Sequence, residues 1–212
     1  MESMIGRPDR AGKVDRMGLG AVLARVRRRR AARRRWREEA LRLYGAAAAA
    51  ARAPALYERY GIPDSFDGRF DALVLMLFLV LDRVERDPAL RKEEADELRR
   101  LLLELAVADW DRALREAGVG DLGVGRHIKK MMTAALGRMT AYGAACAVDD
   151  AGMVDEAGLA AALARNVWRM EEDDGRARSL ARRVIAIRRA LADHPLPALT
   201  EELLAGGTVG EE

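Results

Sequence analysis

A glycine-rich corner between two long helical patterns constrains the fold of this chain more than any other stretch. Residues 115–132 read REAGVGDLGVGRHIKKMM. The apolar spacing before the corner ends at Ala117, and Gly118 follows at the position after a helix end, where a left-handed residue costs least. Helical spacing resumes after Gly125, from Ile128 onward. The stretch therefore predicts a sharp turn between two packed helices.

The same corner contains the pattern G-x-G-x-x-G, from Gly118 to Gly123. That pattern binds dinucleotides when a strand leads into it and a helix leads out of it. Here a helix leads in, and the sequence has no G-K-[ST] phosphate loop. We therefore interpret the glycines as a helix–helix turn and not as a nucleotide site.

Composition predicts an all-α helical bundle with a basic N-terminal helical arm. Ala, Leu, Arg and Glu dominate, which favours helices, and only 5% of the residues are aromatic, so aliphatic side chains must fill the core. We expect a disordered start at 1–18, the basic arm at 19–53, the bundle at 54–205 and a disordered tail at 206–212. Within the arm, the alanine run at 46–51 is interpreted as a connector.

The arm carries most of the excess positive charge. Residues 1–60 hold 16 Lys and Arg against 6 Asp and Glu. Such a helix can bind RNA phosphates on a ribosome, lie on anionic lipid, or face water. The residues that would meet an anionic partner are Arg27, Arg28, Arg29, Arg30, Arg33, Arg34, Arg35 and Trp36.

The most apolar stretch predicts the central helix. Residues 70–86 are apolar on nearly every face between Leu73 and Leu81, as in a helix that is buried by its neighbours or that meets another apolar surface. Ser65 to Asp67 should start this helix. The apolar run is half the length that a bilayer requires, and the first residues lack a signal peptide. We therefore expect a cytoplasmic location, with room for peripheral association at the inner face of a membrane.

The side chains able to perform chemistry do not assemble into an active site. Asp109 and Asp111 are two residues apart and do not share a helix face. His127 has no second ligand at metal spacing, and Cys146 is expected to be a buried apolar residue. A further cluster contains Arg69 and its neighbours Asp67 and Asp71, and we interpret it as a set of local ion pairs or as part of a binding surface. The sequence therefore predicts a protein that is not an enzyme and needs no metal, cofactor or small-molecule substrate.

Three motifs resemble the ubiquinol–cytochrome c chaperone family. They are YGIPD with DGRFD at 60–71, LREAGVGDLGVGRHIKKM at 114–131, and G-R-x-x-A-Y at 137–142. The resemblance covers roughly residues 56–168, and it departs from the family pattern at His127 and at Ala135-Leu136. It implies a non-catalytic assembly chaperone that holds newly made cytochrome b during assembly of the ubiquinol–cytochrome c reductase, respiratory complex III.

The resemblance also implies where the client binds. We expect a groove lined by residues 73–81 and the methionine-bearing helix after the glycine corner. The residues expected on its surface or in its scaffold are Tyr60, Asp64, Asp67, Arg69, Asp71, Gly118, Gly120, Asp121, Lys129 and Lys130. Two other functions remain open at this point: a peripheral bundle that binds lipid or quinone, and a protein that binds RNA or ribosomes through the basic arm.

Overall fold

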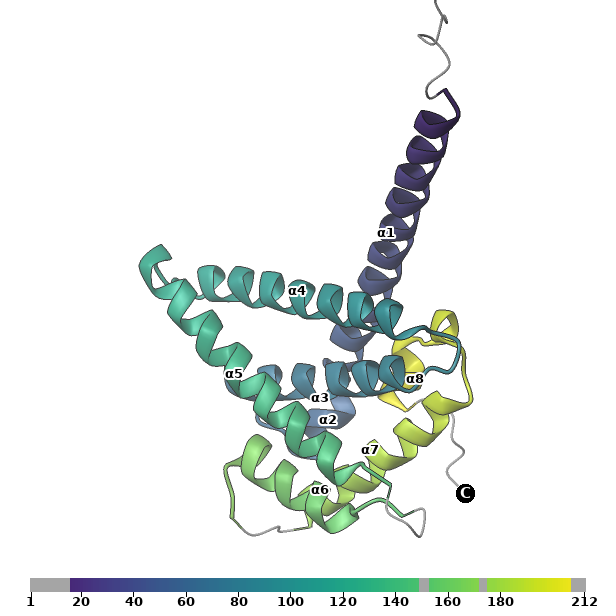
Figure 1. The fold of residues 1–212 in the computed structure, drawn as a ribbon. Coiled ribbons are helices and arrows are strands. Elements are labelled where there is room, and N and C mark those ends of the chain that lie inside the picture. Colours follow the sequence, from purple (N-terminus) through teal and green to yellow (C-terminus); the bar gives the residue numbers. More distant parts are fainter. Residues whose placement is uncertain (1–15, 149–152, 172–174, 207–212) are drawn as a thin grey trace, which may run out of the picture. The chain divides into compact units, whose positions relative to one another are not determined.

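The computed structural model describes residues 16–148, 153–171 and 175–206, and these are helical with no strand beyond one isolated bridge between Val148 and Val154 (Figure 1). The all-α prediction is confirmed. The elements are α1 (Arg16–Ala50), α2 (Pro54–Glu58), α3 (Phe66–Glu85), α4 (Lys92–Glu116), α5 (Asp121–Ala145), α6 (Glu156–Leu163), the π-helical turn η1 (Ala164–Trp168), α7 (Arg176–Ala192), the 3₁₀ turn η2 (Leu196–Ala198) and α8 (Glu201–Ala205). Of the ends predicted to be disordered, residues 1–15 and 207–212 lie outside the described residues.

The chain divides into two compact units, Met1–Trp36 and Arg37–Glu212. The arginine-rich part of α1 belongs to the first unit, where the Arg35 guanidinium lies 5.1 Å from the centre of the Trp36 ring. Among the side chains of this unit that the structure describes, those of Arg27, Arg33, Arg34 and Arg35 are exposed. The side chains of the other predicted arm residues, 28–30, lie outside the described part of the structure.

The last turns of α1 belong to the core of the second unit. Ala47, Ala50 and Ala51 are at most 4% exposed, so the interpretation of the alanine run as a connector is wrong. Small side chains let the helix backbone approach its neighbours closely. Arg42 fixes the same part of α1, because its guanidinium donates hydrogen bonds to the carbonyl oxygens of residues 196 and 199 near the chain end.

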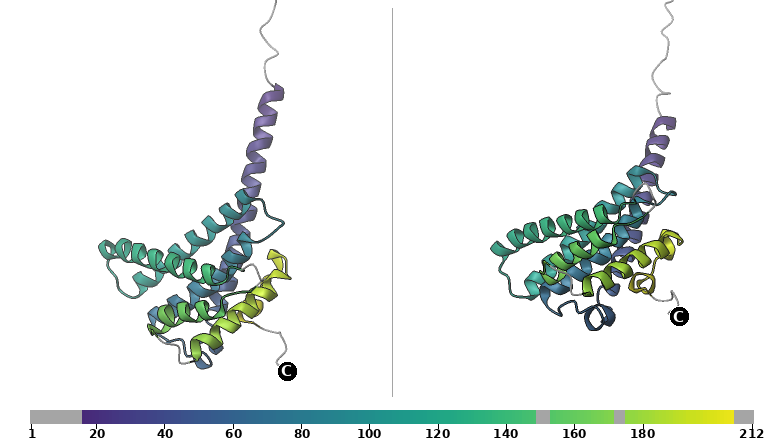
Figure 2. Two further views of the ribbon diagram at one scale, coloured as in Figure 1. Left: turned by 60° about the horizontal axis from the view of Figure 1, so that its bottom comes forward. Right: turned by 90° about the horizontal axis from the view of Figure 1, so that it is seen from below.

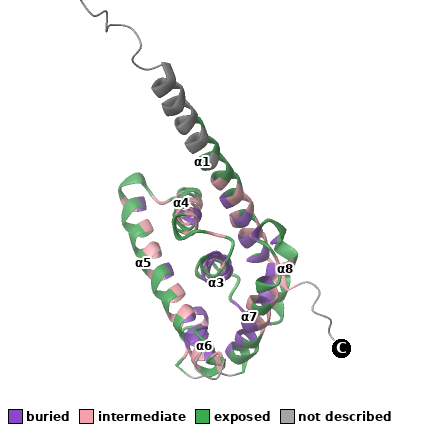
Figure 3. Cartoon of the chain, turned by 45° about the vertical axis from the view of Figure 1, so that its right-hand side comes forward, coloured by how far each residue is buried: buried purple, intermediate pink, exposed green. Residues whose placement is uncertain are grey.

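α3 is the central helix of this unit, as predicted. It contacts α4, α5, α7 and η1, and Figure 3 shows it seen end-on among its neighbours. Residues 74–81 are 0–6% exposed. The helix begins after Ser65, whose side chain accepts a hydrogen bond from the Gly68 amide, 3.1 Å away. Within the described ranges, no helix is both long and apolar enough to cross a membrane.

α4 and α5 form a long hairpin closed by the glycine corner (Figures 1 and 2). Gly118 has the predicted left-handed conformation, with φ of 83°. α5 begins at Asp121, earlier than the sequence suggested, because Gly120 already serves as its N-cap and Gly123 lies inside the helix. The corner therefore takes fewer residues than its glycine content indicates.

Candidate functional site

A buried carboxylate, Asp71, joins three distant parts of the second unit. It lies near the start of α3 and is fully buried. One carboxylate oxygen, Oδ1, lies 2.8 Å from Nε of Arg138 on α5. The other, Oδ2, accepts a 2.8 Å hydrogen bond from Nη1 of Arg169, which follows η1. Arg138 is nearly as buried as the carboxylate, whereas Arg169 is half-exposed. We call these three residues the Asp71 centre.

The surroundings of Asp71 raise the pKa of two side chains. Burial raises the pKa of Asp71 to about 6, because the loss of water disfavours the charged form and the two guanidinium groups offset this loss only in part. The carboxylate is therefore ionised at neutral pH. Burial, reinforced by the charge of Asp71, also raises the pKa of Tyr142. The Asp71 carboxylate itself is closed to solvent, which suits a scaffold better than acid–base catalysis.

Arg169 reaches Asp71 because the helix changes its winding just before it. α6 passes into the π-helical turn η1, and Arg169 then adopts a left-handed conformation with φ of 60°. The turn also directs Trp168 toward the α2–α3 loop, where its Nε1 donates a 2.8 Å hydrogen bond to the Gly61 carbonyl. The α-helix that begins at Glu156 therefore ends at Leu163, where the π-helical turn takes over. π-helical turns of this kind recur at functional sites.

The predicted local partners of Arg69 are also wrong. Nε of Arg69 lies 2.7 Å from Oδ1 of Asp64 at the surface, and this contact lowers the pKa of Asp64. Asp67 stays exposed while Asp71 points into the core. Residues two apart cannot share a helix face, so Asp67 and Asp71 are both poorly placed to meet Arg69. Tyr60, expected on the client surface, is buried, with 6% of its surface exposed.

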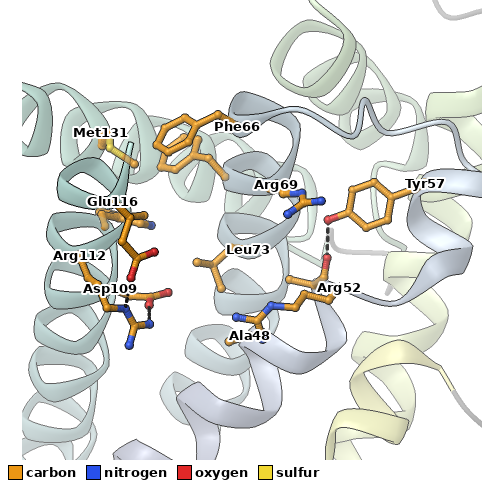
Figure 4. Close-up of a pocket in the computed structure, with 14 residues that line it drawn as sticks. Ala48, Arg52, Tyr57, Phe66, Arg69, Leu73, Asp109, Arg112, Glu116 and Met131 are labelled. Carbon is orange, nitrogen blue, oxygen red and sulfur yellow. Dashed lines mark hydrogen bonds and ion pairs between the residues drawn. The ribbon is translucent and has the colours of Figure 1, made fainter. Parts of the chain in front are cut away.

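A pocket of about 350 Å³ lies between the end of α1, the start of α3 and the end of α4, and we call it the α3–α4 pocket (Figure 4). Its lining also receives one residue from α2 and one from α5. The lining residues are Ala48, Ala51, Arg52, Tyr57, Phe66, Arg69, Phe70, Leu73, Asp109, Trp110, Arg112, Ala113, Glu116 and Met131. Phe66 is 47% exposed, so one of the lining residues presents a large apolar ring at the surface.

The Asp71 centre supports the lining of this pocket. The Arg138 guanidinium lies 5.2 Å from the centre of the Phe70 ring, and that ring lies 5.3 Å from the ring of Trp110. Phe70 and Trp110 both line the pocket. The carboxylate, the guanidinium and the two rings therefore form a continuous row from the core to the pocket.

The charged groups of the α3–α4 pocket are largely paired among themselves. Arg112 forms ion pairs with Asp109 and Glu116, and Asp109 also accepts a 3.0 Å hydrogen bond from the Tyr44 hydroxyl. The lining has no Ser, Cys, His or Lys that could act as a nucleophile. Among the described residues, no three His, Cys, Asp or Glu side chains come together as a metal site. The pocket is suited to binding an apolar group.

The groove predicted along residues 73–81 is not continuous. Leu73 and Met131 line the α3–α4 pocket, whereas Phe78, Leu81 and Met139 line a second hollow of about 400 Å³. The α3 residues between Leu73 and Phe78 are fully or almost fully buried. Of the two hollows, the α3–α4 pocket holds more aromatic side chains, which are the usual anchors of protein recognition.

The predicted residues around the glycine corner lie outside the α3–α4 pocket. Gly118 and Gly120 shape the turn, and Asp121 forms an ion pair with Arg115 across it. Lys129 and Lys130 are exposed on α5. The sequence thus indicated Arg69, which lines the pocket, and Asp71, which supports the lining. It missed Phe66, Trp110, Arg138 and Arg169, of which only Arg138 stood in a recognised motif.

Cys146 should react slowly with thiol reagents in the folded chain. It is fully buried, as predicted, and burial raises its pKa to about 11. At pH 8 about one thiol in a thousand is then ionised, against about a quarter in the unfolded chain. We expect labelling by a chromogenic disulfide to be more than about 100-fold slower in buffer than in denaturant. Equal rates in both conditions would show that the end of α5 opens readily.

Together these features define an all-α binding protein with an aromatic pocket and a buried charged support. The chain matches the family model described as ubiquinol-cytochrome C chaperone over residues 58–205, and it belongs to this family. It is also similar to a solved structure described as the crystal structure of the Cbp3 homolog from Brucella abortus. The two chains share 33% sequence identity and a TM-score of 0.63, over 90% of this chain and 97% of that chain. A comparison with curated proteins gave no match.

Proposed function

We propose that this chain is a non-catalytic assembly chaperone that binds newly made cytochrome b, and that the α3–α4 pocket receives an apolar segment of this client. Membership in the chaperone family supports a chaperone role in the assembly of complex III. We choose this site because Phe66 is half-exposed and lines the pocket together with Phe70 and Trp110.

The pocket has the size and lining that an apolar client needs. About 350 Å³ is within the range of ligand pockets and holds one or two large side chains. Aromatic residues and arginine are enriched where protein interfaces bind most strongly. Met131 adds a flexible side chain that can adapt to different apolar groups. A newly made membrane protein offers many such groups before its helices are packed.

The basic arm gives the proposal a second, electrostatic contact. Its exposed arginines, together with Trp36, suit the phosphates of a ribosome or of an anionic membrane. A chaperone that meets its client during synthesis needs such a location. On this proposal the arm determines where the chaperone works, and the pocket determines what it holds.

Removing the chaperone should deplete haem b. In membranes from a strain without this chain, we expect the reduced-minus-oxidised spectrum to lose the haem b signal of the cytochrome bc complex, and the wild-type chain should restore it. A normal haem b signal together with normal ubiquinol–cytochrome c activity would overturn the proposed function.

The site is tested by exchanging one exposed side chain. Phe66→Ala should reduce the cytochrome b that a tagged chain retains from a translating extract by about ten-fold, as for a typical interface anchor. The matched control is Leu41→Ala, because Leu41 is 50% exposed and does not line the pocket. Equal retention by both variants would place the client elsewhere on the chain.

A further inference from the structure

The outer face of α5 carries three cations that form no ion pair with the part of the chain that the structure describes. Arg126, Lys129 and Lys130 are exposed, and no carboxylate of the described residues lies within ion-pair distance of them. Their spacing brings them onto one side of the helix together with Leu122, one turn before Arg126. The buried residues of α5, such as Val124 and Ala135, lie on the opposite side.

The neighbouring helix α4 pairs several of its arginines with carboxylates. On α4, Arg100 pairs with Glu97 and Glu104, and Arg115 pairs with Asp111. α5 has no Asp or Glu after its first residue, Asp121, and that carboxylate is already paired with Arg115. The charge of the α5 face is therefore left to act on something outside the second unit.

Leu122 identifies the kind of partner. Its side chain is 100% exposed, and it is the second residue of α5, directly after the glycine corner that closes the α4–α5 hairpin. We propose that the outer face of α5 binds an anionic lipid bilayer, with the three cations on the headgroup phosphates and Leu122 entering the interface. The small residues Gly125 and Thr133 leave room for the helix to lie close to the surface.

Lipid fits this face better than nucleic acid does. RNA readers stack bases on aromatic side chains or on arginine planes. The α5 face has no exposed aromatic side chain, and two of its three cations are lysines. A fully exposed leucine contributes nothing to phosphate binding in RNA, whereas a bilayer interface buries it.

This surface shares no residue with the lining of the client pocket or with the basic arm. Met131, the one α5 residue in the α3–α4 pocket, is partly buried and lies away from the cations by its helical position. The chaperone can therefore hold its client and touch a membrane at the same time. The α5 face would also bring the second unit itself to the bilayer, whatever the arm binds.

The test needs a probe on α5, because the arm alone can bring the chain to vesicles. Gly125→Cys places a thiol on the outer face, where a side chain meets nothing within 4 Å, and the buried Cys146 will not compete for the label. The full chain, labelled there with an environment-sensitive fluorophore, is titrated with phosphatidylcholine vesicles that contain about one third phosphatidylglycerol. Pure phosphatidylcholine vesicles serve as the neutral comparison.

We expect a blue shift with the anionic vesicles only. In the same labelled chain, Arg126→Gln/Lys129→Gln/Lys130→Gln should weaken the half-point of this response about 100-fold, or about five-fold for each cation. Leu122→Ser should weaken it a few-fold. The control Arg99→Gln/Arg100→Gln/Arg182→Gln removes the same charge from three arginines that are paired with carboxylates, and it should leave the response nearly unchanged.

Three results would overturn the proposal. The first is an unchanged probe on a chain that still sediments with anionic vesicles, which would assign the binding to the arm alone. The second is an equal response from the α5 triple variant and the control. The third is a probe that responds to generic RNA and not to vesicles. None of these results bears on whether the α3–α4 pocket holds cytochrome b.

Discussion

Asp71→Ala is expected to lower the free energy of unfolding by about 3–5 kcal/mol, the usual cost of removing one partner from a buried ion pair. The reason is the environment of Arg138, which would keep a positive charge in the core with no carboxylate beside it. Arg169 contributes less to the loss, because it is half-exposed and can return to water. Urea unfolding followed by circular dichroism measures the change.

A surface aspartate with the same kind of partner provides the control. Asp64 is paired with Arg69 at 2.7 Å, but both side chains are more than half exposed, so Asp64→Ala should change stability by no more than about 1 kcal/mol. The double variant Asp71→Leu/Arg138→Met should lose much less than the two single changes together, because no charge is then left buried. Additive losses, or an Asp71→Ala loss below that of Asp64→Ala, would contradict this account.

Gly68→Ala should destabilise the fold by about 3 kcal/mol or more. A Cβ atom at this position would lie 1.9 Å from the carbonyl oxygen of Pro63, which is backbone and cannot rotate away as a side chain would. The loop between α2 and α3 would have to move, and with it Phe66 and Arg69 of the pocket. We therefore expect thermal unfolding at lower temperature and weaker retention of cytochrome b.

Gly137 is the matched control for this change. It also lies inside a helix, but it is exposed and an added Cβ would meet nothing within 4 Å. Gly137→Ala should leave stability unchanged or raise it by up to about 1 kcal/mol, since alanine favours a helix over glycine. If Gly68→Ala and Gly137→Ala change the stability equally, then the close approach of the Pro63 carbonyl does not explain why position 68 requires glycine.

Local signals explain which parts of the fold could be predicted. The start of α3 at Ser65 and the left-handed Gly118 follow from caps and apolar spacing that the sequence displays directly. The burial of Ala47 and Ala50 could not be read in the same way. Alanine is compatible with the core and with solvent, so its burial depends on how closely other helices approach, which local spacing does not reveal.

The same limit applies to the candidate site. The sequence could indicate single residues of the site, but it could not indicate the distant residues that they contact. Asp71 was recognised as important, but the sequence suggested only its near neighbour Arg69 as a partner. Its hydrogen-bond donor, Arg169, is 98 residues away and reaches it through a π-helical turn. No particular residue composition marks such a turn in a sequence. Phe66 was missed because an aromatic residue at the start of a helix reads as core until its exposure is known.

The contact of Arg42 with the end of the chain has a consequence for synthesis. Arg42 holds the last turns of α1 through carbonyl groups of Leu196 and Leu199, 154 and 157 residues later. Ala48, Ala51 and Arg52 on or next to those turns form one wall of the α3–α4 pocket. A ribosome must therefore deliver the chain as far as Leu199 before Arg42 can hold that wall in place. If the pocket receives the client as proposed, a copy translated only as far as α7 has a pocket wall that Arg42 does not yet hold.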